Sequence, residues 1–340
     1  MSGACAAGQA VYDVLGRVAD LVADAVPHSG AAWFSMDPHT TLVTGAVVRS
    51  LPATSCFPFF EHNFAGRGVT PYASLARAPA KASALYTAYR GVPERSAMWR
   101  DVLEPFGYQD ELRAACTDNG HCWGAFSLMR DHGDQPFSRR ETRFVQAVAA
   151  MLGPALRSAM IATGDGGEYT DDTAGVVLLD DAGKIVTGTE TGLRRLERLV
   201  ADRPAGNRFS VLDYLRALAT AASPGSPVGL RLCDPDDRWH VVQANTLLGG
   251  GTAVVIRPLH PSELTAGMVL AYRLSPRELE VVELICQGLS THEIAGRLHM
   301  SVHTARDHVK HVFAKTDVTS RGELMARLLT EHSLPRLSPK

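Results

Sequence analysis

Three helix-start signals of one kind lie between Ser275 and Glu323 of the 340-residue chain. Each is a serine followed three residues later by a glutamate, and the pairs are Ser275 with Glu278, Ser290 with Glu293, and Ser320 with Glu323. In such a capping box the serine oxygen accepts a first-turn amide, and the glutamate accepts the amide of the serine. This repetition predicts short helices that are joined by tight turns.

Other residues set the ends of these helices. Pro276 suits a first helical position, since the N–H that proline lacks has no partner there. Ser301 is placed to cap a further helix, and Gly288 to end the first one. The predicted helices cover roughly residues 276–287, 291–298, 302–316 and 321–332. Because only His299 and Met300 separate the middle two, these helices must cross steeply, as in a helix-turn-helix.

The third predicted helix has two different faces. An apolar stripe with the spacing of a buried face consists of Val302, Ala305, Val309, Val312 and Phe313. The opposite side carries His303, Arg306, Asp307 and Lys310 at positions i, i+3, i+4 and i+7. A short helix that presents Arg and Lys in this way fits the DNA major groove, where cationic side chains read guanine edges. A solvated basic face on a small helical bundle is the structural alternative.

This stretch resembles the DNA-binding domain of LuxR-type transcriptional regulators. The resemblance rests on Leu274-Ser275-x-Arg277-Glu278, Gly288-x-Ser290, Glu293-Ile294-Ala295, Leu298, Ser301, Thr304, His308-Val309, Lys315 and Ser320-Arg321-x-Glu323-Leu324. It implies double-stranded DNA as partner. It also implies that Arg306, Asp307 and Lys310 face the bases, with His303 on the same surface, and that Ser301, Thr304 and Lys315 meet the phosphate backbone. The sequence departs from the family pattern at Ala305 and Thr316, two positions of the helical core.

Charge is unevenly distributed along the chain. The whole carries a net charge of −2, but residues 270–340 hold 10 Lys and Arg against 8 Asp and Glu, which gives +2. A weakly positive DNA-binding domain is expected to need two copies for tight binding, so we expect a homodimer. We find no run of apolar residues long enough to span a membrane and no secretory signal, and therefore expect a cytoplasmic protein without membrane association.

The N-terminal part predicts an α+β domain over residues 8–160. A helix at 11–25 precedes strands at 31–36 and 42–47, and a hairpin joins 111–117 to 121–129 through Asn119-Gly120, which suits a tight turn. Ser138 and Glu141 form another capping box, opening a helix with Phe144, Val145, Val148, Met151 and Leu152 on one face.

This order resembles a GAF domain, on the residues Gly124-Ala125-Phe126-Ser127-Leu128 and Phe137-Ser138-x-x-Glu141. The resemblance implies a small-molecule site beside the sheet. The candidate ligand-binding residues are Phe57, Phe60, His62, Phe64 and Tyr72. The alternative is that these aromatic residues belong to an ordinary core.

A polar, glycine-rich linker is predicted at residues 161–172, followed by a second α+β domain at 173–258. Two strands, a helical middle and three antiparallel strands resemble a PAS domain, with Gly175–Asp180 and Gly183-Lys184-Ile185-Val186 as its opening. A connector at 259–272 then leads to the all-α, four-helix LuxR-type DNA-binding domain that is expected at 273–334. The chain is thus expected to be multidomain.

Two other kinds of chemistry remain open. Asp180-Asp181 after a strand fits a phosphoacceptor receiver domain, which has alternating strands and helices and often precedes this type of reader. Cys116 and Cys122 flank the hairpin turn, so they form a candidate redox pair, or a metal site together with His121.

No catalytic constellation, metal set or cofactor motif stands out, so no enzyme, cofactor or metal is expected. The predicted function is that of a sequence-specific, dimeric transcriptional regulator with an unknown small-molecule effector and RNA polymerase as a further partner. The alternatives are a response regulator controlled by phosphorylation and an interaction protein that no longer binds DNA.

Overall fold

The computed structural model describes residues 7–38, 40–64, 72–162, 173–200, 210–221, 228–234, 239–259, 272 and 274–330. These residues form two compact units, one with those up to Leu259 and one with those from Tyr272 onward. No helix in the described ranges is long and apolar enough to cross a membrane. Most of the predicted linker and connector and the chain beyond residue 330 lie outside the described residues.

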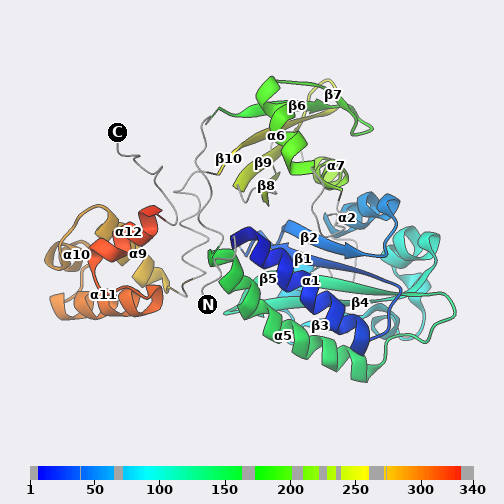
Figure 1. The fold of residues 1–340 in the computed structure, drawn as a ribbon, viewed down its shortest axis with the longest axis horizontal. Coiled ribbons are helices and arrows are strands. Elements are labelled where there is room, and N and C mark those ends of the chain that lie inside the picture. Colours follow the sequence, from blue (N-terminus) through cyan, green and yellow to red (C-terminus); the bar gives the residue numbers. More distant parts are fainter. Residues whose placement is uncertain are drawn as a thin grey trace. The chain divides into compact units, whose positions relative to one another are not determined.

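The first unit begins with a five-stranded antiparallel sheet in the order β2-β1-β5-β4-β3. Its strands are β1 (Gly30–Met36), β2 (Val43–Arg49), β3 (Ala82–Ala84), β4 (Tyr108–Asp118) and β5 (His121–Asp131). Helices α1 (Ala7–Ala25) and α5 (Arg139–Ala162) lie side by side along one face (Figure 1). On the opposite face, Phe34 of β1 contacts rings of α2 (Cys56–Phe64) and α3 (Tyr72–Arg77).

The local turn and cap signals of this region are confirmed. Asn119 and Gly120 have φ angles of 50° and 79°, so both central residues of the β4–β5 turn take the left-handed conformation that a two-residue hairpin requires. Glu141 accepts a hydrogen bond of 2.7 Å from the Ser138 amide, and its own amide donates to Ser138 Oγ over 3.2 Å. This capping box lies immediately before α5.

Only part of the predicted apolar face of α5 is buried. Its buried face consists of Val145, Ala149, Leu152, Leu156 and Ala159. Phe144 and Met151 do not belong to it, because 43% and 73% of their surfaces are exposed. Aromatic and long apolar residues favour burial on average, but the turn of the helix relative to the sheet decides which stripe is covered.

A second five-stranded sheet follows, in the order β7-β6-β10-β9-β8 and again antiparallel. Its strands are β6 (Gly175–Leu179), β7 (Ile185–Gly188), β8 (Val228–Cys233), β9 (Trp239–Thr246) and β10 (Thr252–Pro258). Helices α6 (Glu190–Val200) and α7 (Val211–Ala221) follow β7 and precede β8 along the chain. In both sheets the order along the sheet is second, first, fifth, fourth and third strand. The second sheet therefore repeats the topology of the first.

This topology contradicts the receiver-domain alternative, which needs parallel strands connected by helices. The two aspartates have structural roles instead. Asp180 Oδ1 accepts the Lys184 amide over 2.8 Å, and Asp181 Oδ1 accepts the Gly251 amide over 2.6 Å. Both carboxylates thus hold turns at one end of the sheet.

A continuous hydrophobic core joins the two sheets. Tyr214 of α7 is fully buried, its hydroxyl donates to the Val43 carbonyl of β2 over 3.0 Å, and its ring lies 4.6 Å from that of Phe60. Arg231 of β8 pairs with the buried Asp37 over 3.4 Å. The two sheets of this unit are therefore packed together through the middle of its core.

The second unit is a helical bundle of α9 (Pro276–Cys286), α10 (Thr291–Arg297), α11 (Val302–Thr316) and α12 (Arg321–Thr330). These bounds agree with the predicted helices within two residues. Its core includes Val281, Ile285, Ile294, Ala295, Ala305, Val309, Val312 and Leu324.

Candidate nucleic-acid interface and ligand cavity

Serine caps set the start of the helices in the second unit. Ser275 and Ser290 form complete capping boxes with Glu278 and Glu293. Ser301 accepts the Thr304 amide over 3.0 Å and so begins α11. Gly288, with a φ of +83°, closes α9, and His299, with a φ of 52°, turns the chain between α10 and α11. These caps and turns thus set where α11 begins after α10.

The polar face of α11 is open to solvent. Arg306 and Lys310 are exposed and form no ion pair with another described residue. His303 is 83% exposed, and its Nε2 lies 3.9 Å from Asp307 Oδ2 on the same helix. Ser301 and Thr304, also exposed, share a hydrogen bond of 2.8 Å between their hydroxyls. Two cations and several hydroxyl and imidazole groups therefore share one face.

Three other cations of the bundle link its helices, namely Arg277, Arg321 and Lys315. Arg277 donates to the Leu298 carbonyl and links α9 to the end of α10. Arg321 donates to the Leu289 carbonyl and, over 2.8 Å, to Thr291 Oγ1. Lys315, expected at the phosphate backbone, donates to Glu278 Oε2 over 2.6 Å. Its direct contact with DNA stays a prediction.

The two departures from the family pattern are accommodated in the core. Ala305 is fully buried, and the hydroxyl of the buried Thr316 donates to the Val312 carbonyl over 2.8 Å. A buried hydroxyl with a partner costs little, whereas one without a partner costs ~1–3 kcal/mol. Thr316 therefore does not destabilise the bundle through its hydroxyl.

The ion pair of Glu278 and Lys315 makes the bundle sensitive to acid. Burial raises the pKa of Glu278, but hydrogen bonds from Lys315 and Ser275 outweigh this effect, so the pKa lies below its usual range. A carboxylate with a lowered pKa stabilises the fold above its unfolded-state pKa, and this stabilisation is lost as the pH falls through the lower, folded-state value.

We therefore expect Glu278→Gln to destabilise the second unit by about 1–2 kcal/mol at pH 7, and by progressively less as the pH falls below about 4. Glutamine can still cap the helix, so the change isolates the ion pair with Lys315. Chemical denaturation at several pH values measures it. Glu280→Gln, which alters the exposed pair with Arg277, is the matched control and should have little effect. An equal loss in both variants, or a loss that does not change with pH, would contradict the assignment.

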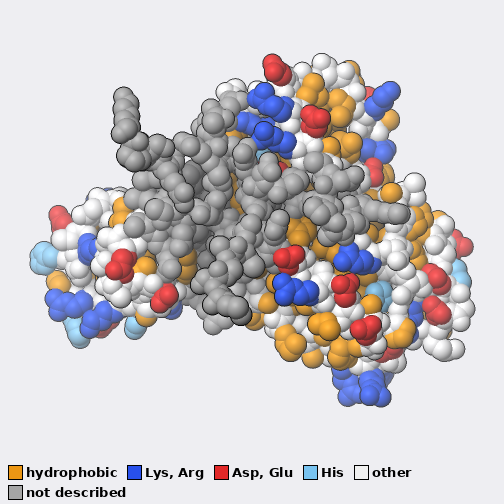
Figure 2. Space-filling model, viewed as in Figure 1, with side chains coloured by type: hydrophobic (Ala, Val, Ile, Leu, Met, Phe, Trp, Pro, Cys, Tyr) orange, Lys and Arg blue, Asp and Glu red, His pale blue; other side chains and the backbone are white. Residues whose placement is uncertain are grey.

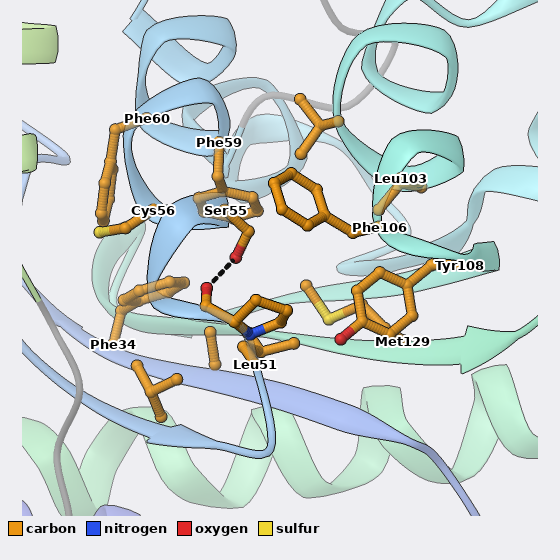
Figure 3. Close-up of a pocket in the computed structure, with 14 residues that line it drawn as sticks. Phe34, Leu51, Ser55, Cys56, Phe59, Phe60, Leu103, Phe106, Tyr108 and Met129 are labelled. Atoms are coloured by element: carbon orange, nitrogen blue, oxygen red, sulfur yellow. Dashed lines mark hydrogen bonds between the residues drawn. The ribbon is translucent and has the colours of Figure 1, made fainter.

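An apolar cavity of about 40 Å³ lies in the first unit, between the sheet and the segments that follow β2 (Figure 3). Figure 3 shows Phe59, Phe106 and Tyr108 directed into this space from three different segments. Phe34 and Met129 of the sheet form its floor. The Ser55 hydroxyl at its margin is engaged with the Pro52 carbonyl over 2.7 Å, so the lining offers few open polar groups.

Of the five candidate ligand-binding residues, only Phe60 lines this cavity. Phe57 lies beneath the guanidinium of Arg216, and Phe64 lies 5.4 Å from the Tyr214 ring, so both contact α7 instead. The buried His62 places Nε2 3.0 Å from Asp101 Oδ2. The sequence did not indicate the π-helical turn Trp99–Leu103 or Phe106, which complete the cavity.

Tyr72 belongs to a buried polar cluster on the same face of the sheet. Its hydroxyl is 2.5 Å from Ser127 Oγ, which donates to Glu111 Oε1 over 2.7 Å. Arg113 Nε donates to the same carboxylate oxygen over 2.8 Å, and its guanidinium lies over the Phe59 and Tyr72 rings. Phe59 thus separates this cluster from the apolar cavity.

The cysteine hypothesis has little geometric support. Cys116 pairs with Gly124 and Cys122 with Thr117, so the two cysteines are not cross-strand partners, and the register shift between Cys116 and Thr117 moves Cys116 one residue further along β5. Both thiols are buried and free, and burial raises the pKa of Cys122 to about 12 and that of Cys116 well above its usual range. Such thiols are poor nucleophiles. Among the described residues, no group of three potential ligands is arranged to hold a metal ion.

These features define a sensor-type α+β domain and a helix-turn-helix reader in one chain. Residues 272–328 match the model of bacterial regulatory proteins of the luxR family, and residues 13–156 match that of the GAF domain. The chain therefore contains a GAF domain and a C-terminal LuxR-type helix-turn-helix domain.

Individual relatives share parts of this arrangement. The nitrate/nitrite response regulator protein NarL of Escherichia coli is 31% identical over 142 residues, which are 39% of this chain and 64% of NarL. An HTH-type transcriptional regulator of Mycobacterium bovis is 44% identical over 52 residues, which are 15% of this chain and 6% of that protein. The crystal structure of a GAF domain/HD domain protein from Geobacter sulfurreducens has 14% identity and a TM-score of 0.30, and covers 47% of this chain and 95% of its own.

Proposed function

We propose that the protein is a dimeric, sequence-specific DNA-binding regulator of transcription whose GAF domain responds to a small molecule. The observation that carries this proposal is the solvent-exposed face of α11. Arg306 and Lys310 are exposed on this face, while the opposite face of α11 packs into the core of the helical bundle. Arg and Lys at this spacing are suited to guanine edges in the major groove. The match to the luxR family supports the same reading. Such a protein acts in the cytoplasm, where its DNA lies.

The proposed DNA contacts include the remaining polar residues of this surface. Asp307 and His303 lie beside the two cations, and Ser301, Thr304 and Lys315 flank them at the ends of α11. Asp307 is compatible with DNA where it accepts from a cytosine amino group, because the phosphates would otherwise repel it. The same carboxylate is what favours the second candidate function, that of an interaction protein which no longer binds DNA.

The effector is proposed to be a small, largely apolar molecule. The cavity beside α2 has room for only a few atoms in its present form, so an effector would have to widen it by moving a wall. Phe60 is such a wall, and its ring also contacts Tyr214 of α7. Displacement of α2 would therefore reach the second sheet directly, and a ligand that favours the displaced arrangement shifts the population of states.

We further propose that residues 173–258 are a PAS-like domain. This is supported by the observed sequence of two strands, two helices and three antiparallel strands. The proposed domains cover residues 8–160, 173–258 and 273–334. Packing between α2 and α7 gives the middle domain a position from which to relay the state of the cavity.

Selection from random duplex DNA tests the proposal, run in parallel with the full chain and with residues 265–340, which include the second unit and its own core. We expect both to enrich one inverted repeat, or the fragment alone if the upstream domains inhibit. The first outcome would direct attention to RNA polymerase as the partner of those domains. Enrichment by neither protein would contradict DNA binding and favour the interaction protein.

A further inference from the structure

One column of side chains runs along the middle of the solvent-exposed face of α11, opposite the stripe that packs into the core. It consists of His303, Asp307 and His311, at positions i, i+4 and i+8. Each therefore lies one helical turn, or about 6 Å, from the next. The side chains of His303 and Asp307 are 83% and 47% exposed, and His311 is also exposed. The centre of the proposed DNA-binding face is thus a carboxylate between two imidazoles.

The second unit has no excess of positive charge while its histidines are neutral. Residues 274–330 hold 7 Lys and Arg against 7 Asp and Glu, which gives 0, together with 5 His. Figure 2 shows histidine side chains beside basic ones along the edge of this unit that α11 occupies in Figure 1. Because attraction to phosphates supplies much of the affinity of a DNA-binding domain, the charge of these imidazoles matters for binding.

Asp307 makes the protonation state of His303 important. Its Oδ2 lies 3.9 Å from His303 Nε2. Beside a neutral imidazole, the carboxylate is a negative charge on a face that must approach phosphates, which repel it. A protonated His303 instead forms an ion pair with it, and a protonated His311 adds a positive charge one turn away. Protonation of both imidazoles therefore changes the charge of the column from −1 to +1.

Helices α9, α10 and α12 pack against α11 on its buried side. The titratable groups around the column, with described side chains, are Arg277, Glu278, Glu280, Glu283 and Cys286 of α9, His292, Glu293 and Arg297 of α10, Arg321 and Glu323 of α12, and Arg306, His308, Lys310 and Lys315 of α11, with Asp317 at its end. None of these described groups forms an ion pair with His303 or His311. Asp307 is therefore the charge that acts most directly on His303.

The contacts that hold the bundle together persist where imidazoles titrate. Burial raises the pKa of Glu278, but hydrogen bonds from Lys315 and Ser275 outweigh this effect and hold it below its usual range. Hydrogen bonds from Ser290 likewise lower the pKa of Glu293. Histidine changes its charge between about pH 5 and 8, well above these carboxylates. A change in DNA affinity over that range then reports on the face of α11 and not on unfolding.

We propose that His303 and His311 take part in the DNA interface in their protonated forms, so that DNA binding takes up protons. The negative phosphates favour the charged imidazoles. Affinity is accordingly highest at acidic pH and declines as the pH rises and the imidazoles lose their protons. The inference rests on the proposed DNA-binding function and adds a regulation of the same surface, in which Asp307 increases the difference between the two protonation states.

Fluorescence anisotropy with the selected duplex, at fixed salt and at pH 6 and pH 8, tests this inference for the full chain and for residues 265–340. We expect binding to be tighter at pH 6 by about tenfold, and the slope of log K against log salt to be steeper there by about 2, because two further charges meet the DNA. The double variant His303→Gln with His311→Gln should bind with nearly equal affinity at the two pH values. His132→Gln, at an exposed histidine of the first unit, is the matched control and should keep the pH dependence.

Asp307→Asn tests the part of the carboxylate. It should raise the affinity at pH 8 more than at pH 6, because it removes the negative charge that a neutral His303 leaves uncompensated. Both histidines are exposed, so the variants should fold, which thermal unfolding at both pH values checks.

Equal affinity of the unchanged protein at pH 6 and pH 8 would overturn the inference and leave DNA binding intact. So would a pH dependence that survives in the double histidine variant. No binding at either pH, by the full chain or by residues 265–340, would instead contradict the proposed function itself.

Discussion

Arg306→Ala is expected to weaken binding of the full chain to its selected duplex by about 10- to 100-fold, equivalent to roughly 1–3 kcal/mol, with relaxed preference at one base pair. Arg306 is exposed on the open face of α11 and forms no ion pair with another described residue, so its guanidinium is available for a bidentate contact with guanine. Fluorescence anisotropy with the selected duplex and with single-base variants of it measures both effects.

Lys310→Ala is expected to reduce affinity within the same range. The two residues differ in what they should do to specificity, because a lysine that meets a phosphate weakens all sequences about equally and lowers the salt dependence. Arg198→Ala, an exposed change of the same charge on α6, is the matched control and should bind normally. Full affinity in both α11 variants would show that this face does not contact DNA.

Arg113→Met is expected to destabilise the first unit by about 3–5 kcal/mol, because it leaves the Glu111 carboxylate buried without its cation. The two side chains are 4% and 2% exposed and are 2.8 Å apart. The carboxylate would keep the Ser127 hydroxyl as a donor but lose the charge that compensates its burial. The midpoint of urea unfolding, followed by tryptophan fluorescence, measures the loss.

A double variant distinguishes the effect of an isolated buried charge from the effect of losing the ion pair. Glu111→Leu with Arg113→Met removes both charges, and we expect it to recover a large part of the stability lost in Arg113→Met, since the site then contains no isolated charge. Arg157→Met, which breaks the more exposed pair with Asp118 across 2.7 Å, is the control and should cost less. A double variant as unstable as the sum of the two single variants would contradict this account.

The sequence by itself determined the elements whose signals are local. A serine and a glutamate three residues apart satisfy each other's backbone groups in one turn of helix, so Ser275, Ser290 and Ser138 marked helix starts without reference to the rest of the chain. Asn119 and Gly120 did the same for the hairpin, because few residues tolerate positive φ. The exposed cations of α11 followed from helical spacing alone.

Only the tertiary structure decided which apolar side chains share a space. Phe57, Phe60 and Phe64 lie on one short helix, yet Phe60 lines the cavity while the other two contact α7. Cys116 and Cys122 flank the hairpin turn, yet they pair with Gly124 and Thr117 and not with each other.

The same is true of the predicted apolar face of α5, on which Val145 and Leu152 are buried while Phe144 and Met151 are exposed. The physical reason is that capping and turn formation involve atoms a few bonds apart, whereas burial depends on where segments distant in sequence come to rest. The spacing that predicts an apolar face does not say what that face will cover.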